Sequence, residues 1–178
     1  MSEELPVISG ELTEKGVLIY DQNERSLLQS KGYGEETEKA LILKDYEATY
    51  LLYNKFLKLK KDGDEITIEK YVDHIISKDT SAWTRFLVYR DLRSRGYIVR
   101  EGFGFGVDFR VYERGEYATK PAKYVVIGLN EGTKRPISNL NETVNQIKKM
   151  GKEAVIAVIE SRGEVIYYKI RSWMPYHD

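Results

Sequence analysis

Cysteine is absent from this 178-residue sequence, and histidine occurs only twice, as His74 and His177. Without a thiol, the chain cannot form disulfides, zinc ribbons, iron–sulfur clusters or a cysteine nucleophile. Two histidines are also too few for a metal cage built from imidazoles. We therefore expect neither a metal nor a cofactor, and any chemistry must come from the remaining oxygen and nitrogen side chains.

Long hydrophobic runs are missing as well. No segment approaches the roughly 18 consecutive apolar residues of a transmembrane helix. The acidic start of the chain lacks the basic and apolar regions of a secretory signal. Hydrophobic residues make up 42% of the sequence and charged residues 31%, which is enough apolar material for a core and too much charge for a membrane protein. The sequence predicts a cytoplasmic protein without membrane contact.

The net charge is zero, because 28 lysines and arginines balance 28 acidic residues. The two halves of the chain nevertheless differ. Residues 1–80 hold 11 basic and 17 acidic residues, a balance of −6, whereas residues 81–178 hold 17 and 11, a balance of +6. This asymmetry favours two units with different roles, of which the basic one is the candidate for contact with nucleic acid. An unevenly charged, solvated surface is the alternative interpretation.

The hydrophobic pattern predicts an α/β protein of two domains. An α+β N-terminal domain covers residues 1–79, and a C-terminal α/β domain with a mixed central sheet covers residues 80–178, with a hinge at 78–80. In the N-terminal domain we expect an apolar strand at 16–20, a turn at 21–23, a short helix at 26–31, a helix from Asp45 with Tyr46, Tyr50, Tyr53 and Leu57 on one face, a polar turn at 60–64, and a helix capped by Thr67.

The C-terminal domain is expected to alternate between helices and strands. Ala154–Ile159 is an almost continuous apolar run, as expected of a strand that is buried on both faces. The other predicted elements are a helix from Ser81 that stops at Gly96, strands at 97–100, 107–114 and 124–129, a helix at 140–150, and a last strand at 165–170.

Two kinds of phosphate chemistry are disfavoured by the motifs. Gly102, Gly104 and Gly106 form a GFGFG run, but this run lacks the glycine spacing and the following helix of a nucleotide-binding loop. A metal-dependent nuclease would pair Asp108 with a carboxylate on the next strand. The strand at 124–128 contains none. Metal-free RNA cleavage remains, in which a base, an acid and a cation act on the ribose 2′-hydroxyl and the phosphate.

Several motifs resemble the archaeal tRNA-splicing endonuclease family. They are LVYRDLRSRGYIVR at residues 87–100, GVDFRVYERG at 106–115, and the strands at 154–160 and 165–168. Their order and spacing match across the C-terminal half. The resemblance implies a C-terminal tRNA-intron endonuclease-like domain and a multi-subunit enzyme that excises introns from precursor tRNA. Family cleavage leaves a 2′,3′-cyclic phosphate and a 5′-hydroxyl, without a metal.

The family's catalytic set is a tyrosine, a histidine and a lysine. Tyr112 matches the tyrosine and Lys152 matches the lysine. The histidine position falls on Pro121 when counted back from Tyr124 and on Ala122 when counted forward from Tyr112, and neither side chain can donate a proton. In addition, Asn145 and Gly151 stand where the resemblance implies arginines.

The resemblance therefore predicts a non-catalytic, structural subunit that pairs with a separate catalytic chain in a heterotetramer. A self-sufficient enzyme that uses Tyr112 and Lys152 is one alternative, and a stand-alone tRNA-binding protein is another. Assembly is expected through the last strands, at 165–173, and through the loop at 129–135. In that loop Glu131 is the only acidic residue and is predicted to dock into a basic cleft of a neighbouring subunit.

Overall fold

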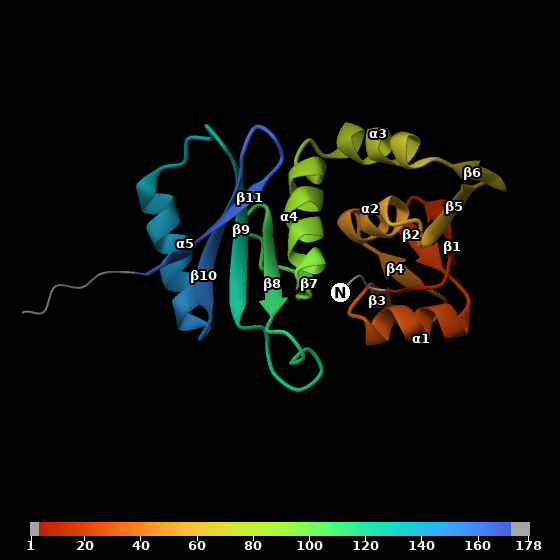
Figure 1. Ribbon diagram of the computed structural model, residues 1–178, viewed down its shortest axis with the longest axis horizontal. Helices are drawn as coiled ribbons and strands as arrows, with labels where there is room; N and C mark the ends of the chain where they lie inside the picture. The colour runs from red at the N-terminus through yellow and green to blue at the C-terminus, as the bar shows by residue number, and fades with distance from the viewer. Residues whose placement is uncertain (1–3, 172–178) are drawn as a thin grey trace, which may run out of the picture. The chain divides into compact units, whose positions relative to one another are not determined.

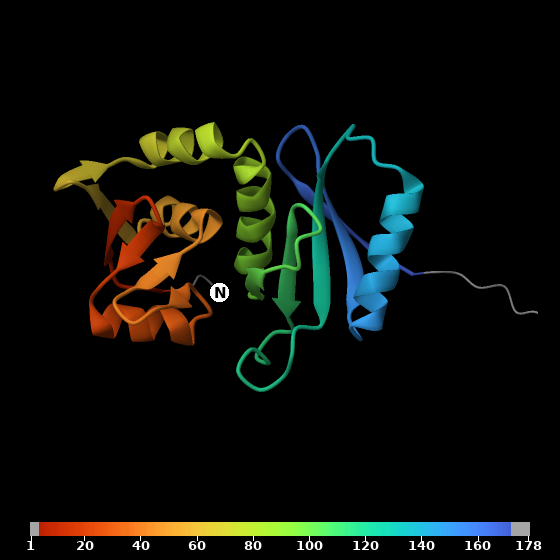
Figure 2. The ribbon, with the colours of Figure 1, turned by 180° about the vertical axis from the view of Figure 1, so that it is seen from behind.

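The computed structural model describes residues 4–171, which form two compact units, one up to Ile98 and the other from Val99 (Figures 1 and 2). Unit 1 carries four helices and a mixed sheet, and the described part of unit 2 carries one helix and a mixed sheet, which confirms the predicted α/β class. The predicted domain boundary between residues 79 and 80 divides the chain by charge and motif, whereas the two units are divided by compactness. That boundary stays a prediction.

Unit 1 is built on a six-stranded sheet with the strand order β3-β4-β2-β1-β5-β6. Strands β1 and β5 run parallel, and the other neighbouring pairs run antiparallel. The strands are β1 (Ile8–Thr13), β2 (Gly16–Ile19), β3 (Glu35–Glu36), β4 (Leu41–Leu43), β5 (Leu57–Lys61) and β6 (Asp64–Ile66). The helices are α1 (Gln22–Ser30), α2 (Asp45–Tyr53), α3 (Ile68–Lys78) and α4 (Ala82–Ser94).

Tyrosines on α2 and α4 join these two helices, which lie side by side in Figure 1. The ring of Tyr89 lies 4.9 Å from that of Tyr46 and 5.7 Å from that of Tyr50, and all three are buried. The helical spacing of the tyrosines thus predicted a real packing face. Tyr53, at the end of the same stripe, is half exposed.

Two local predictions in unit 1 are wrong, and one is confirmed with narrower bounds. Helix α2 ends at Tyr53, and Leu57 begins β5 instead of continuing the helix. The expected polar turn at 60–64 is present as the turn of the hairpin between β5 and β6, whose two central residues, Asp62 and Gly63, have φ of 52° and 88°. Both values suit a tight two-residue hairpin turn. Asp21, expected in a turn, instead caps α1 by accepting hydrogen bonds from the amides of residues 23 and 24.

Unit 2 is built on a five-stranded sheet with the strand order β11-β10-β9-β8-β7. Strands β9 and β10 run parallel and are connected by α5, while β8 and β11 run antiparallel to their partners β9 and β10. The strands are β7 (Ile98–Glu101), β8 (Asp108–Tyr112), β9 (Tyr124–Asn130), β10 (Glu153–Ile159) and β11 (Val165–Ile170), and the helix is α5 (Ile137–Lys149).

The core of unit 2 lies between α5 and one face of this sheet (Figure 1). Val144 and Ile147 on the helix pack against side chains of β9 and β10, as the predicted helical spacing requires. This packing holds the C-terminal half of α5 against the strands. The buried members are Val125, Ile127, Val144, Ile147 and Ala154, and Phe105, Leu140 and Ile170 pack around them.

Candidate active site

Three strand ends meet at one edge of the sheet of unit 2. Strand β8 ends at Tyr112, and its Val111 pairs with Tyr124, the first residue of β9. Tyr124 in turn pairs with Glu153, the first residue of β10. The register therefore brings Tyr112, the segment before Tyr124 and Lys152 to the same edge, although 40 positions of sequence separate the first from the last. These are the positions that the sequence predicts for the tyrosine, the histidine and the lysine.

The end of α5 fixes the position of Lys152. Gly151 has φ of 74°, and its amide donates to the carbonyl of Lys148 while the amide of Lys152 donates to that of Ile147. This pair of hydrogen bonds is the Schellman motif, which closes a helix at a residue with left-handed backbone. The Nζ of Lys152 then donates to the backbone carbonyl of Ala122 at 2.6 Å. The lysine thus directly contacts the segment where the histidine is missing.

Tyr112 lies at the end of β8 with a half-buried side chain. Its ring meets that of Tyr117 edge to face, with 5.0 Å between the ring centroids. Side chains alternate along a strand, so Tyr112 shares a face with Arg110, which pairs with Val125 on the α5 side of the sheet. Lys152 precedes Ala154 on that same side by two residues. Alternation therefore directs both candidate residues toward the α5 face.

Pro121 and Ala122 differ in their surroundings. Pro121 is exposed, whereas Ala122 is only 5% exposed. Just after them, the amide of Lys123 donates to the carbonyl of Val111, and the carbonyl of Lys123 accepts from Glu153. The hydrogen bonding that joins β9 to β8 and β10 thus begins at residue 123. A longer side chain can therefore extend into solvent at position 121 but not at the buried position 122.

A polar cluster on the other face of this edge was missed by the sequence analysis. The Oε2 of Glu113 accepts hydrogen bonds from Lys123 Nζ at 3.2 Å and from the Tyr124 hydroxyl at 3.0 Å. These hydrogen bonds lower the pKa of Glu113. Partial burial, with the neighbouring carboxylate as a second cause, raises the pKa of Tyr124. Only the register between β8 and β9 brings Glu113 next to Lys123 and Tyr124. No local sequence pattern therefore indicated this cluster.

Glu131 lies at the opposite end of β9, away from Tyr112 and Lys152. Its amide donates to the carbonyl of Ile159, and its carboxylate accepts from the amide of Ser161 at 3.1 Å. The exposed side chain is therefore tied to the turn between β10 and β11. Within this unit, Glu131 is not part of the candidate active site.

The described residues of unit 2 include no histidine. His74 belongs to unit 1, where its ring stacks near Tyr71 and lines a pocket of about 210 Å³. Burial, followed by the charges of Lys78 and Lys61, lowers its pKa. His177 lies outside the described residues, as do residues 172 and 173 of the expected assembly segment.

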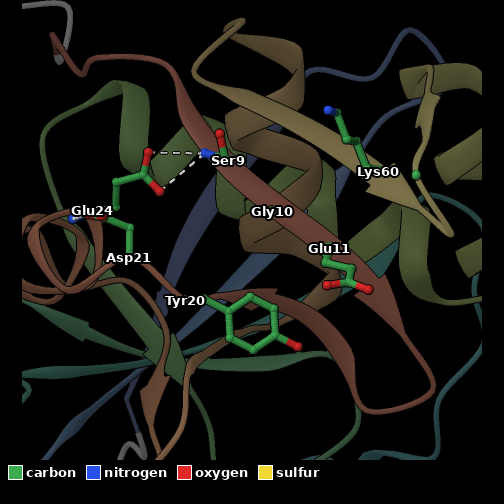
Figure 3. A pocket seen from close by; sticks show the side chains of 8 residues that line it. Ser9, Gly10, Glu11, Tyr20, Asp21, Glu24 and Lys60 are labelled. Carbon is green, nitrogen blue, oxygen red and sulfur yellow. Dashed lines mark hydrogen bonds between the residues drawn. The ribbon is translucent and has the colours of Figure 1, made fainter.

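A second pocket of unit 1, of about 350 Å³, has Glu11, Asp21 and Glu24 in its lining together with Lys60 (Figure 3). Glu24 turns its carboxylate toward the amide of Ser9, with both oxygens at 3.3 Å, and Glu11 and Lys60 extend from neighbouring strands. None of the predicted site residues lines it. Among residues 4–171, no group of three or more His, Asp or Glu side chains is placed to hold a metal ion, and none of the helices has the length and apolarity to cross a membrane.

At the predicted site positions this edge offers the phenol of Tyr112 and the ammonium group of Lys152, but the two candidate histidine positions hold no side chain that transfers protons. A phenol can exchange a proton with a reacting hydroxyl, and an ammonium group can stabilise the negative charge that develops on a phosphate. Acid–base cleavage of RNA also needs a donor for the leaving oxygen. Pro121 and Ala122 have no side-chain proton to give, so this arrangement provides two of the three functions.

Comparison with known proteins gives matches along almost the whole chain. A family model described as the catalytic C-terminal domain of tRNA intron endonuclease matches residues 82–167, and one described as the N-terminal domain matches residues 8–72. The tRNA-splicing endonuclease of Methanococcus vannielii is 35% identical over 173 residues, which cover 96% of this chain and 97% of the relative. That of Methanothermobacter thermautotrophicus is 32% identical over 165 residues, covering 92% and 96%.

Proposed function

Since the chain belongs to the tRNA-splicing endonuclease family, we propose that it takes part in the excision of introns from precursor tRNA, with cleavage to a 2′,3′-cyclic phosphate and a 5′-hydroxyl. Within that reaction we assign this chain the role of a structural subunit. A separate catalytic chain supplies the complete active site, and the two chains form a heterotetramer.

One observation carries the structural role. Lys152 Nζ donates a hydrogen bond to the carbonyl of Ala122, so the lysine contacts one of the two candidate positions of the missing histidine. Position 121 has the space for an acid and holds a proline instead. A general acid contributes about 10²–10⁴-fold in rate. The site therefore lacks the group that protonates the leaving oxygen while it keeps the tyrosine and the lysine.

Features at the far side of unit 2 support the assembly. Strand β11 is an edge strand of the described sheet, and its Ile166 and Tyr168 are 48% and 52% exposed. An edge strand with exposed apolar side chains is suited to pair with another chain. We propose that β11 forms one contact between subunits. Glu131, which lies beyond the end of β9, is proposed to enter a basic cleft of a neighbouring subunit.

A self-sufficient enzyme is the second candidate, because Tyr112 and Lys152 meet at one sheet edge as an active site requires. A cleavage assay distinguishes the structural subunit from the self-sufficient enzyme. It measures metal-free cleavage of a precursor tRNA by the purified chain alone and by the chain together with its catalytic partner. For a structural subunit we expect no cleavage by the chain alone. The assembled complex should cleave at the same rate whether this chain carries Tyr112 or Tyr112→Phe.

The matched control is Tyr117→Phe, which removes the hydroxyl group from the ring that contacts Tyr112. Metal-independent cleavage by the chain alone that is lost in Tyr112→Phe and kept in Tyr117→Phe would establish the self-sufficient enzyme. A chain that binds tRNA tightly but never co-purifies or assembles with a second subunit would instead be a stand-alone tRNA-binding protein. Native mass measurement on co-expressed material gives the stoichiometry.

A further inference from the structure

The two phenylalanines of the loop between β7 and β8 have different surroundings. Phe105 is partly buried and packs against the core of unit 2. Phe103, two residues earlier, is 42% exposed, although phenylalanine is usually buried. The loop is thus anchored by one aromatic ring and displays the other. An exposed ring on an anchored loop requires an explanation that core packing does not give.

The buried carboxylate of Asp108 ties this loop to β8 by two hydrogen bonds. Its Oδ2 accepts from the amide of Phe103 at 2.6 Å, and its Oδ1 accepts from the amide of Phe105 at 2.9 Å. The loop approaches so closely that a Cβ on Gly102 would come within 2.1 Å of the carboxylate. The glycine and the aspartate therefore fix the backbone that carries Phe103. A ring that is already ordered loses little conformational entropy when a ligand binds.

The guanidinium of Arg110 lies over this ring and adds a positive charge to it. Its guanidinium carbon lies 5.7 Å from the centroid of Phe103. The Nε donates to the carbonyl of Glu101 at 2.7 Å, which fixes the plane of the guanidinium. Within residues 4–171, no hydrogen bond or ion pair engages its terminal nitrogens. The pair therefore presents an aromatic face together with donors suited to a phosphate.

The position of the pair relates it to the candidate active site. Arg110 and Tyr112 are two residues apart on β8 and lie on the same face, about 7 Å apart along the strand. Helix α5 covers β9 and β10 on this face, and the side chains of Arg110 and Tyr112 remain only half-buried. A chain of nucleotides that passes Tyr112 along β8 thus reaches Arg110 and Phe103 next.

We propose that Phe103 and Arg110 form a stacking platform for an unpaired nucleotide of the RNA substrate. Proteins commonly read unpaired bases by stacking them on aromatic rings and guanidinium planes. RNA is favoured over a protein partner because the platform is cationic and continues from Tyr112. The inference rests on the proposed function, since it takes RNA as the ligand. A subunit that does not cleave still has to hold the substrate for its partner.

The test measures stacking directly. The assembled complex is titrated with a precursor tRNA that carries single 2-aminopurine substitutions at unpaired positions, and the quenching of fluorescence reports stacking. We expect quenching at one position with the wild type and with Phe103→Tyr, which keeps an aromatic ring. Phe103→Leu keeps an apolar side chain but should abolish the quenching and weaken binding roughly 5- to 150-fold, since one base stack is lost.

Two further variants make the test specific. Arg110→Gln should reduce the dependence of log K on log salt by about 0.7, the value for one phosphate contact in single-stranded RNA. Tyr20→Leu removes an aromatic ring of unit 1 that is 52% exposed, and it should change neither quenching nor affinity. Phe103→Leu replaces an exposed side chain, so the melting temperature of this variant should match that of the wild type. If it does not, the salt dependence of RNA binding by Arg110→Gln still tests the platform.

Unchanged quenching and affinity in Phe103→Leu would overturn the platform. Loss of assembly with intact RNA binding would also overturn it, because the surface would then contact protein. Both results differ from failure of the proposed function, in which no assembly of this chain cleaves precursor tRNA whatever residue stands at position 103.

Discussion

A single glycine determines where Lys152 meets the sheet. Gly151 closes α5 with φ of 74°, and the following residue is then directed to the carbonyl of Ala122. Residues with a Cβ occupy this backbone region at a cost of about 1 kcal/mol relative to glycine. Compared with the arginine that the resemblance implies at this position, glycine carries no charge and relaxes the backbone beside the lysine.

We expect Gly151→Arg to lower the free energy of unfolding by about 1 kcal/mol through this strain. No atom lies within 4 Å of a Cβ built at this position, so a steric clash contributes nothing. Asn145→Arg, on the exposed side of α5, is the matched control and should stay within about 0.5 kcal/mol of the wild type. Urea unfolding midpoints compare the two, and equal midpoints would contradict the strain.

Glu113 should make the stability of the folded state depend on pH. Hydrogen bonds from Lys123 and Tyr124 lower its pKa, so the folded state binds its proton less readily than the unfolded state. Its contribution is thus present at neutral pH and is lost as the pH falls below the ordinary glutamate value, about 4.3. The melting temperature measured from pH 6 to pH 3 should decline less in Glu113→Gln than in the wild type. Glu164→Gln, at an exposed turn position, should follow the wild-type curve.

At the scale of elements, hydrophobic periodicity predicted helices whose buried face is set by residues close together in the sequence. The spacing of Leu140, Val144 and Ile147 predicted α5 and its buried face. The same reasoning extended α2 to Leu57, because nothing local in the sequence shows that Leu57 pairs with Ile8 across a parallel ladder. Strand β1 was missed altogether, since its alternation is weakened by small and polar residues such as Gly10.

The burial of α5 gives a test of this element. Ile147 is fully buried against the sheet, whereas Ile137, at the start of the same helix, is 84% exposed. Ile147→Ala removes buried methyl groups and leaves a cavity, so we expect a loss of about 2–5 kcal/mol. Ile137→Ala makes the same chemical change in solvent and should cost less than about 0.5 kcal/mol. Equal losses in chemical denaturation would show that the helix does not pack through Ile147.

At the scale of the whole molecule, the candidate site depends on register rather than on sequence distance. The resemblance named Tyr112 and Lys152, but the shared edge exists because Val111 pairs with Tyr124 and Tyr124 pairs with Glu153. The choice between positions 121 and 122 was open in the sequence. Position 121 is exposed and position 122 is buried, so exposure favours position 121. The sequence did not show this difference, because burial depends on neighbours that are distant in the chain. Assembly is further removed from the sequence, since it needs a surface on a second chain.

Reversal of one charge tests that assembly. Glu131 is exposed, and its carboxylate makes a single hydrogen bond to the amide of Ser161. The fold should therefore lose at most about 1 kcal/mol in Glu131→Lys. A lysine that faces a basic cleft would cost several kcal/mol of binding, so we expect the complex with the catalytic chain to dissociate while the melting temperature of this chain barely changes. Glu164→Lys makes the same charge change in the neighbouring turn and should leave the complex intact. Size-exclusion chromatography of the co-expressed pair distinguishes the two variants, and an intact complex in Glu131→Lys would remove this residue from the interface.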